Sequence, residues 1–371
     1  QERAALWSSH CRSARIGWPK YSATNVNVRM KKLRILAALA ASAALALTAC
    51  SPAENDAASS GKNEGEGQTV SITHALGTTK ITGKPKRVAT VGWNNQEVPL
   101  ALGIQPVGMP KAAFGDADGD GMVTWVKQKV EELGGEKPVL FDETDGIQFE
   151  KVADTKPDVI LAAYSGLTKE DYEKLSKIAP TVAYPNKPWN TTMKQMVTMD
   201  SKALGMEKEG KQLLADLDKE VDQQMAKHPN LKGKKVLFTA FGTNGSDPSK
   251  VGFYVSGDPR ADILEKAGMG VPDIVKKYSG NTDSFYKEVS SDKPEMFSDV
   301  DLIVTYGPQD DPTSLVADMQ KHPLVGRIPA VKAGHVAVLK NDDLGAAANP
   351  SPLGLQWGFG KFLDLLDGAL K

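Results

Sequence analysis

The chain is poor in cysteine. Its 371 residues include two cysteines, Cys11 and Cys50. Cys11 lies ahead of the export signal described below, so a mature exported chain would keep only one thiol. We therefore expect no disulfide, and the core must be stable without one.

Arginine is also scarce. After residue 34 the sequence contains only Arg87, Arg260 and Arg327, although lysine is abundant. A cluster of arginines that grips phosphates or carboxylates in bidentate fashion is therefore not expected. The formal net charge is −1. Since the chain has no excess of positive charge, nucleic acid is not expected to be a partner.

Motifs of catalysis and of metal binding are missing as well. The five histidines, at positions 10, 74, 228, 322 and 335, form no H-E-x-x-H pair, and no G-x-S-x-G elbow occurs. The glycine-containing segment 242–246 lacks both nucleotide-binding spacings. We expect a binding protein without an enzymatic activity, a cofactor or a bare-metal site.

The N-terminal region has the pattern of an exported lipoprotein. Residues 1–29 precede a more ordinary start at Met30 and are interpreted as an upstream extension. Residues 30–49 combine a basic start with an apolar run of 13 residues, Ile35 to Leu47, which indicates a signal peptide. Leu47-Thr48-Ala49-Cys50 resembles the bacterial lipobox, so Cys50 would become the lipidated N-terminus on the outer face of the cell membrane. Residues 50–68 are polar and predict a flexible tether.

The rest of the chain predicts two α/β lobes on either side of a helical middle. Strand patterns that end in glycine occur at 86–92 and 234–242, and strands alternate with helices at short period, which favours parallel sheets. Apolar residues at three- and four-residue steps predict a linking helix at 189–206 and a second helix that stops near His228. We expect an N-terminal lobe at 69–188 and a C-terminal lobe at 207–371, with a ligand cleft between them.

Aromatic residues follow several predicted strands. Loops at the carboxyl ends of strands line the ligand crevice of open α/β sheets, which makes these residues candidates for ligand contact. Arg260 begins a helix and either reaches the cleft or forms a salt bridge at the helix start. The candidate ligand-binding residues are Trp93, Asn94, Phe114, Trp125, Tyr164, Phe241, Phe253, Tyr254, Arg260 and Tyr306.

An aspartate-rich segment requires separate weighing. Asp116, Asp118 and Asp120 match three ligand positions of a calcium loop, and Gly121 matches its glycine. The bidentate glutamate at position 12 is replaced by Lys127. Calcium binding is therefore a weak hypothesis, and an acidic turn before a helix is the alternative.

Several motifs together resemble one known family. The segments 84–88, 156–160, 178–181 and 329–336 are similar in order and spacing to the iron–siderophore solute-binding lipoproteins of bacterial ATP-binding-cassette importers, over residues 69–371. The resemblance implies two Rossmann-like lobes joined by one long helix (class III), a monomer, and delivery of a ferric chelate to a permease. It also implies one acidic docking residue on each lobe. Glu150 matches the position in the first lobe, whereas the matching position in the second lobe is Lys293, so that Asp292 or its alternative Glu295 would serve there instead.

The leading hypothesis is a lipid-anchored receptor for a ferric siderophore. A siderophore fills the coordination sphere of its iron, so the protein needs shape, aromatic walls and a few donors rather than metal ligands. The scarcity of arginine favours a near-neutral hydroxamate chelate over an anionic citrate or catecholate. Alternatives are a haem or corrinoid receptor, a metal-dependent surface hydrolase that uses Asp116 to Asp120, and a structural or adhesive lipoprotein.

Overall fold

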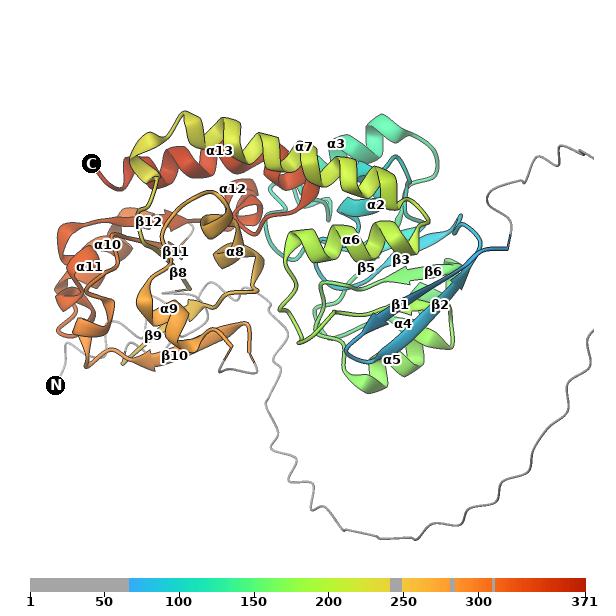
Figure 1. The fold of residues 1–371 in the computed structure, drawn as a ribbon, viewed down its shortest axis with the longest axis horizontal. Helices are drawn as coiled ribbons and strands as arrows, with labels where there is room; N and C mark the ends of the chain where they lie inside the picture. The colour runs from blue at the N-terminus through green and yellow to red at the C-terminus, as the bar shows by residue number, and fades with distance from the viewer. Residues whose placement is uncertain (1–66, 241–248, 281–283, 309–310) are drawn as a thin grey trace, which may run out of the picture. The chain divides into compact units, whose positions relative to one another are not determined.

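The computed structural model describes residues 67–240, 249–280, 284–308 and 311–371. These residues contain two five-stranded sheets and a separate antiparallel hairpin (Figure 1). The hairpin pairs β1 (Thr69–His74) with β2 (Gly77–Thr82), as the alternating sequence predicts.

The first sheet is entirely parallel and has the strand order β5-β4-β3-β6-β7. Its strands are β3 (Val88–Thr90), β4 (Gly108–Pro110), β5 (Val139–Phe141), β6 (Val159–Leu161) and β7 (Thr181–Val182). The strand order reverses between β3 and β6. In doubly wound sheets the ligand crevice forms outside the strand ends at such a point.

The second sheet repeats this order as β10-β9-β8-β11-β12. Strands β8, β11 and β12 are parallel, whereas β9 and β10 run antiparallel at one edge. The bounds are β8 (Val236–Thr239), β9 (Lys250–Tyr254), β10 (Tyr286–Ser290), β11 (Leu302–Tyr306) and β12 (Val336–Leu339). Its order reverses between β8 and β11, so the predicted fold class of two Rossmann-like halves is confirmed.

Helices connect the strands of both sheets. Around the first sheet they are α2 (Glu97–Ala101), α3 (Thr124–Leu133), α4 (Phe149–Asp154) and α5 (Lys169–Ser176). Around the second they are α8 (Pro259–Lys266), α9 (Asp273–Tyr278), α10 (Pro312–Lys321), α11 (Pro329–Ala333), α12 (Asp343–Ala347) and α13 (Pro352–Gly368). Short 3-10 turns are η1 (Pro229–Leu231), η2 (Pro294–Phe297) and η3 (Val325–Arg327).

The helical middle differs in detail from the prediction. Trp189 adopts a positive φ of 58° and lies outside the helix. The helix α6 (Met193–Ala203) starts only after Thr192, whose side chain and that of Gln195 form a reciprocal capping box. Gly205, at φ 65°, ends it and leads into α7 (Glu207–Ala226), a helix of 20 residues. The long connecting helix is thus α7, and α6 is a shorter helix that packs on β6 and β7.

Helices α7 and α13 pack along each other (Figure 1). Both contribute to the largest buried apolar cluster of the described residues, through Leu217 of α7 and Leu355 of α13. The cluster also contains Met109 of the first sheet and Val304 of the second. The ends of the two sheets are therefore held in one continuous core. Within the described part of the chain, no helix is long and apolar enough to cross a bilayer.

Three strands were missed by the sequence patterns. β4 and β5 are only three residues each, too short to show a period. β10 begins at Tyr286, in a segment for which no strand was predicted, and pairs with β9. Its polar residues match an edge position in the sheet.

Candidate ligand-binding site

The end of β3 and the end of β6 meet where the first sheet changes direction. The backbone N–H of Trp93 donates to the carbonyl of Tyr164 at 3.1 Å. The side chain of Asn95 joins the same two loops, because its amide donates to the Tyr164 carbonyl at 3.0 Å and its oxygen accepts from the Tyr164 N–H at 3.0 Å. The predicted neighbourhood of Trp93 and Tyr164 is therefore real.

A glycine makes this close approach possible. Gly92 has φ 82°, and a Cβ at this position would lie 2.7 Å from the Tyr164 carbonyl oxygen. Its N–H donates to Oε2 of Glu143 at 3.0 Å. Glu143 follows β5, and burial raises the pKa of its carboxyl to about 8. The loop that carries Trp93 thus rests on a buried carboxylic acid.

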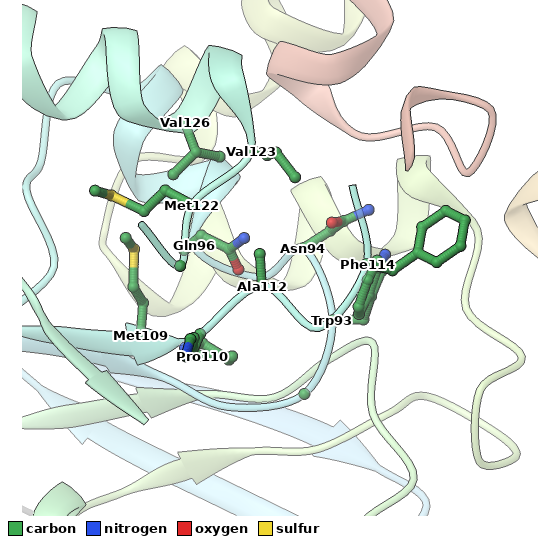
Figure 2. Close-up of a pocket in the computed structure, with 13 residues that line it drawn as sticks. Trp93, Asn94, Gln96, Met109, Pro110, Ala112, Phe114, Met122, Val123 and Val126 are labelled. Carbon is green, nitrogen blue, oxygen red and sulfur yellow. The ribbon is translucent and has the colours of Figure 1, made fainter. Parts of the chain in front are cut away.

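The loops after β3 and β4 enclose a hollow (Figure 2). Met109 and Met122 lie on one side of it, and Trp93 and Phe114 lie on the other. The space inside, counted out to open solvent, is about 380 Å³, and little of it is enclosed by the protein. A bulky ligand would need this hollow to widen.

Gln96 supplies a polar group to the hollow. Figure 2 shows its amide between the methionines and Phe114. Its Oε1 is buried and has no hydrogen-bond partner among the described residues. Since a buried polar atom without a partner costs free energy, this oxygen is a ready acceptor for a ligand donor.

A buried arginine lies close to the same strand ends. We define the arginine centre as Arg260, Asp258, Tyr164, Tyr254 and Tyr306. Arg260 is 2% exposed and Asp258 is fully buried. The carboxylate of Asp258 accepts from Nε of Arg260 at 2.8 Å and from Nη2 at 2.7 Å. The guanidinium lies 3.7 Å above the Tyr254 ring, a cation–π contact.

The arginine centre joins elements of both sheets. Arg260 begins α8, Tyr254 ends β9 and Tyr306 ends β11, whereas Tyr164 follows β6 of the first sheet. Arg260 Nη2 donates to the Tyr164 hydroxyl at 3.5 Å, and the amide of Asn349 donates to the same hydroxyl at 3.2 Å. Tyr164 is therefore the residue through which the first sheet contacts the charged guanidinium of Arg260.

The protonation states in the centre are fixed by burial. Burial raises the pKa of the Tyr164, Tyr254 and Tyr306 hydroxyls above the usual tyrosine range, although Arg260 opposes this. Burial also works against the charge of Arg260, but the attraction of Asp258 outweighs it and its pKa is raised. The centre thus contains neutral phenols around one compensated ion pair.

Phe114 connects the hollow to the arginine centre. It lines the hollow, and its ring packs edge-on against Tyr306 with centroids 5.5 Å apart. Asn94 also spans the two parts of the fold, because its amide donates to the carbonyl of Asn349 at 3.4 Å. Trp93, Tyr164 and Tyr306 accordingly belong to one neighbourhood rather than to separate cores.

Glu97 ties α13 to the first sheet beside this site. Its Oε1 accepts from Nε1 of Trp125 at 2.7 Å. Its Oε2 accepts from the backbone N–H groups of Leu353 and Gly354 at 2.9 and 3.1 Å, at the N-terminus of α13, where a carboxylate is favoured. Burial raises the Glu97 pKa, and these hydrogen bonds oppose the rise.

Two predicted ligand contacts lie elsewhere. Trp125 is 5% exposed, packs on Trp357 with centroids 5.1 Å apart and does not line the hollow. Phe253 is fully buried beside Tyr278 in a different apolar cluster from Tyr254, because adjacent strand residues point to opposite faces. Phe241 and Cys50 lie outside the described residues.

The aspartate loop, Asp116 to Asp120, already holds a cation. The three carboxylates converge within 4.8 Å, but Nζ of Lys127 contacts Asp118 and Asp120 at 2.6 Å each. The hydrogen bonds that Lys127 donates to Asp118 and Asp120 raise the pKa of Lys127. Asp116 accepts from the backbone of Gly119 and Gly121 at 2.9 and 2.8 Å. The ammonium group thus places one positive charge beside two of the three carboxylates that calcium would need.

The two acidic residues assigned to permease docking are on the surface. Glu150 is in the first turn of α4, and Asp292 lies between β10 and η2. Both are exposed. Exposure alone does not test the docking assignment, which stays a prediction.

Four residues of the site carried no clear signal in the sequence. Asp258, Asn349, Gln96 and Glu143 are common polar residues in loops or at helix starts. Only Asp258 had a usable pattern, since Asp-Pro ahead of a helix indicates an N-cap. Their roles arise from contacts between segments that are distant in the sequence.

Comparison with known proteins gives consistent matches. The model of the periplasmic binding protein family matches residues 88–342. The probable siderophore-binding lipoprotein YfiY of Bacillus subtilis is 30% identical over 268 residues, which is 71% of this chain and 76% of YfiY. The Fe(3+)-citrate-binding protein YfmC of the same organism is 27% identical over 301 residues, 79% of this chain and 85% of YfmC.

A solved structure agrees with these matches. PiaA of Streptococcus pneumoniae TIGR4, crystallised in complex with ferrichrome, is 45% identical to this chain. The alignment covers 81% of this chain and 98% of PiaA, with a TM-score of 0.76.

Proposed function

Because the chain belongs to the periplasmic binding protein family, whose members bind solutes and are not enzymes, we propose that it captures a ferric siderophore, with a hydroxamate chelate favoured, and delivers it to an ATP-binding-cassette permease for iron uptake. The observation that carries this proposal is the arginine centre next to the hollow of Trp93 and Phe114. The likeness to PiaA, crystallised with ferrichrome, supports it.

The site suits a metal that arrives already coordinated. Among the described residues, the cluster that could hold a bare metal is the aspartate loop, where Lys127 forms ion pairs with Asp118 and Asp120. A ferric chelate instead presents oxygen atoms and apolar surface. Neutral phenols and the guanidinium of Arg260 can donate hydrogen bonds to those oxygens, and the aromatic rings offer contact area. The amide oxygen of Gln96 can accept from a donor group elsewhere on the ligand.

Binding requires the contacts across the site to separate. Tyr164 is 3% exposed and Tyr306 is 6% exposed, so a chelate reaches them only when Tyr164 moves away from Arg260 and Asn349. These contacts are few and at 3.2–3.5 Å, so they cost little to break. Opening between the sheets exposes the aromatic faces, and closure on the chelate buries them again.

Delivery would use the surface residues and the N-terminal anchor. Glu150 and Asp292 would meet basic residues of the permease, one from each half of the fold. Lipidation of Cys50 would hold the protein at the outer face of the membrane, with residues 51–68 as a tether. Replacing Cys50 by Ala should release the protein from the membrane fraction of cells without changing ligand binding in vitro.

Fluorescence titration tests the proposal. Ferrichrome, a ferrioxamine, a ferric catecholate, ferric citrate and hemin would each be added at micromolar protein. Quenching by a ferric hydroxamate, largely lost in Trp93→Phe, is expected. Response to hemin alone would favour a haem receptor, and absence of any response would contradict ligand capture.

A matched pair of variants tests the role of the arginine centre. Tyr164→Phe removes a hydroxyl that would donate to a chelate oxygen once Tyr164 has separated from Arg260, and we expect it to weaken chelate binding about tenfold, the loss of about one hydrogen bond. Tyr278→Phe makes the same chemical change beside Phe253, away from the site. It should bind as the wild type does. Equal affinities for the two variants would contradict the assignment of Tyr164.

A further inference from the structure

Asp258 holds Arg260 in place and cancels its charge. The carboxylate accepts from the Arg260 backbone N–H at 2.9 Å, from Nε at 2.8 Å and from Nη2 at 2.7 Å. Its exposure is 0% and that of Arg260 is 2%, so water screens neither charge. The pair is therefore rigid and carries no net charge.

The other groups around Arg260 do not change this balance. Tyr254 and Tyr164 act on the guanidinium as neutral phenols, whose pKa values are raised by burial. Asp262, on the same helix, is partly buried, and burial raises its pKa also. Asp258 is thus the carboxylate in direct contact with the guanidinium, and it decides the net charge that a ligand meets.

We infer that Asp258 is a specificity-determining residue: by cancelling the charge of Arg260, it makes the arginine centre favour a ferric chelate without net charge over an anionic one. This inference rests on the proposed function and adds to it the charge class of the ligand. Arg260 still donates hydrogen bonds to chelate oxygens, but it offers no uncompensated charge to attract an anion.

The two classes of ferric chelate differ in net charge. The charges of three hydroxamates cancel that of the ferric ion, whereas three catecholates or citrate leave the complex anionic. An anion that enters a buried site loses its hydration and needs an opposite charge in return. Because Asp258 already cancels the charge of Arg260, no net positive charge is left to attract the anion, and the carboxylate repels it.

The experiment compares ferrichrome, which is neutral, with an anionic ferric tris-catecholate. Dissociation constants for both are measured on the wild type, on Asp258→Asn and on Asp273→Asn. Asparagine keeps the shape of Asp258 and its capping of α8. Asp273→Asn removes an exposed carboxylate beside Lys235, at the opposite, amino end of β8.

We expect the wild type and Asp273→Asn to prefer ferrichrome. In Asp258→Asn the ratio of the two dissociation constants should shift toward the catecholate by about tenfold or more, since an uncompensated buried charge then faces the ligand. In the double variant Asp258→Asn/Arg260→Gln, which has neither charge, this shift should disappear. An unchanged ratio in folded Asp258→Asn, or an equal shift in the double variant, would overturn the inference.

A measurement on the wild type alone keeps the inference testable if a variant fails to fold. Tighter binding of the catecholate than of ferrichrome would refute the role of Asp258 while leaving siderophore capture intact. Binding of neither chelate would instead remove the proposed function, and the inference with it. A clear preference for ferrichrome supports both.

Discussion

Replacing Glu143 by Gln should make the protein more stable at neutral and basic pH. Oε1 of Glu143 is buried without a hydrogen-bond partner among the described residues, and Oε2 accepts only the N–H of Gly92 among the hydrogen bonds described above. One hydrogen bond does not compensate the burial of a carboxylate, so the acid keeps its proton to about pH 8. A glutamine has the same shape and never ionises.

The magnitude follows from the difference between the two protonation equilibria. The ordinary pKa of 4.5 is raised to about 8 in the folded protein. Each pKa unit corresponds to about 1.4 kcal/mol, so the ceiling is about 5 kcal/mol. Because Glu143 as a whole is only half-buried, water reaches part of the side chain. We therefore expect a gain of about 2–4 kcal/mol.

The direction of the Glu143 pKa shift determines the pH range over which the two proteins differ in stability. As the pH rises above 4.5, the unfolded chain releases the Glu143 proton while the folded chain keeps it to about pH 8. The free energy of unfolding of the wild type therefore falls across this window relative to Glu143→Gln. Below it, both proteins carry a neutral group and should be similarly stable.

Denaturation by urea at several pH values between about 4 and 9 measures this difference. All other titrating groups are shared, so they cancel in the comparison. Glu150→Gln, which makes the same change at an exposed position on α4, is the control for the substitution itself. A difference between wild type and Glu143→Gln that stays constant with pH would refute the reasoning.

Three further predictions concern other buried or paired groups. Glu97→Ala should lower the free energy of unfolding by about 3 kcal/mol, because Trp125 and the first N–H groups of α13 lose their acceptor; a change within experimental error in a urea titration would contradict this. Asp200 is fully buried, both of its oxygens lack a partner within the described residues, and burial raises its pKa. Asp200→Leu should therefore raise the free energy of unfolding by about 1–3 kcal/mol near neutral pH, and less in acid, where the aspartate is protonated; lower stability near neutral pH would show that the carboxylate has a partner. Millimolar calcium should leave the melting temperature unchanged because Lys127 occupies the aspartate loop, and a rise would restore the calcium hypothesis.

The sequence predicted the architecture well because its signals are local. Strand patterns at 86–92 and 234–242 identified β3 and β8, and helical periodicity identified α7. Strand ends then placed Trp93 and Tyr164 near each other, since parallel strands end on one edge of a sheet. Tyr306 ends β11 of the second sheet, and only the packing of the two sheets brings it to this site. The family comparisons confirm the resemblance that the motifs gave.

Local signals failed where an element is short or where one backbone angle decides. The three-residue strands β4 and β5 have no measurable period. Trp189 fits an apolar helical pattern, but its positive φ keeps it outside α6, where its ring packs on Tyr164 with centroids 5.6 Å apart. That position depends on a contact with a loop that precedes it by more than twenty residues.

By itself, the sequence determined the two-sheet α/β class, the helical connection and the aromatic character of the strand ends, because each depends on neighbours along the chain. Only the tertiary structure decided that Asp258 neutralises Arg260, that Tyr164 and Asn349 meet at that pair, and that Phe253 faces away. These facts depend on which segments pack together and on which face each side chain points. Burial then fixes the charges and protonation states of the groups in contact, and no local pattern in the sequence indicates which groups are buried together.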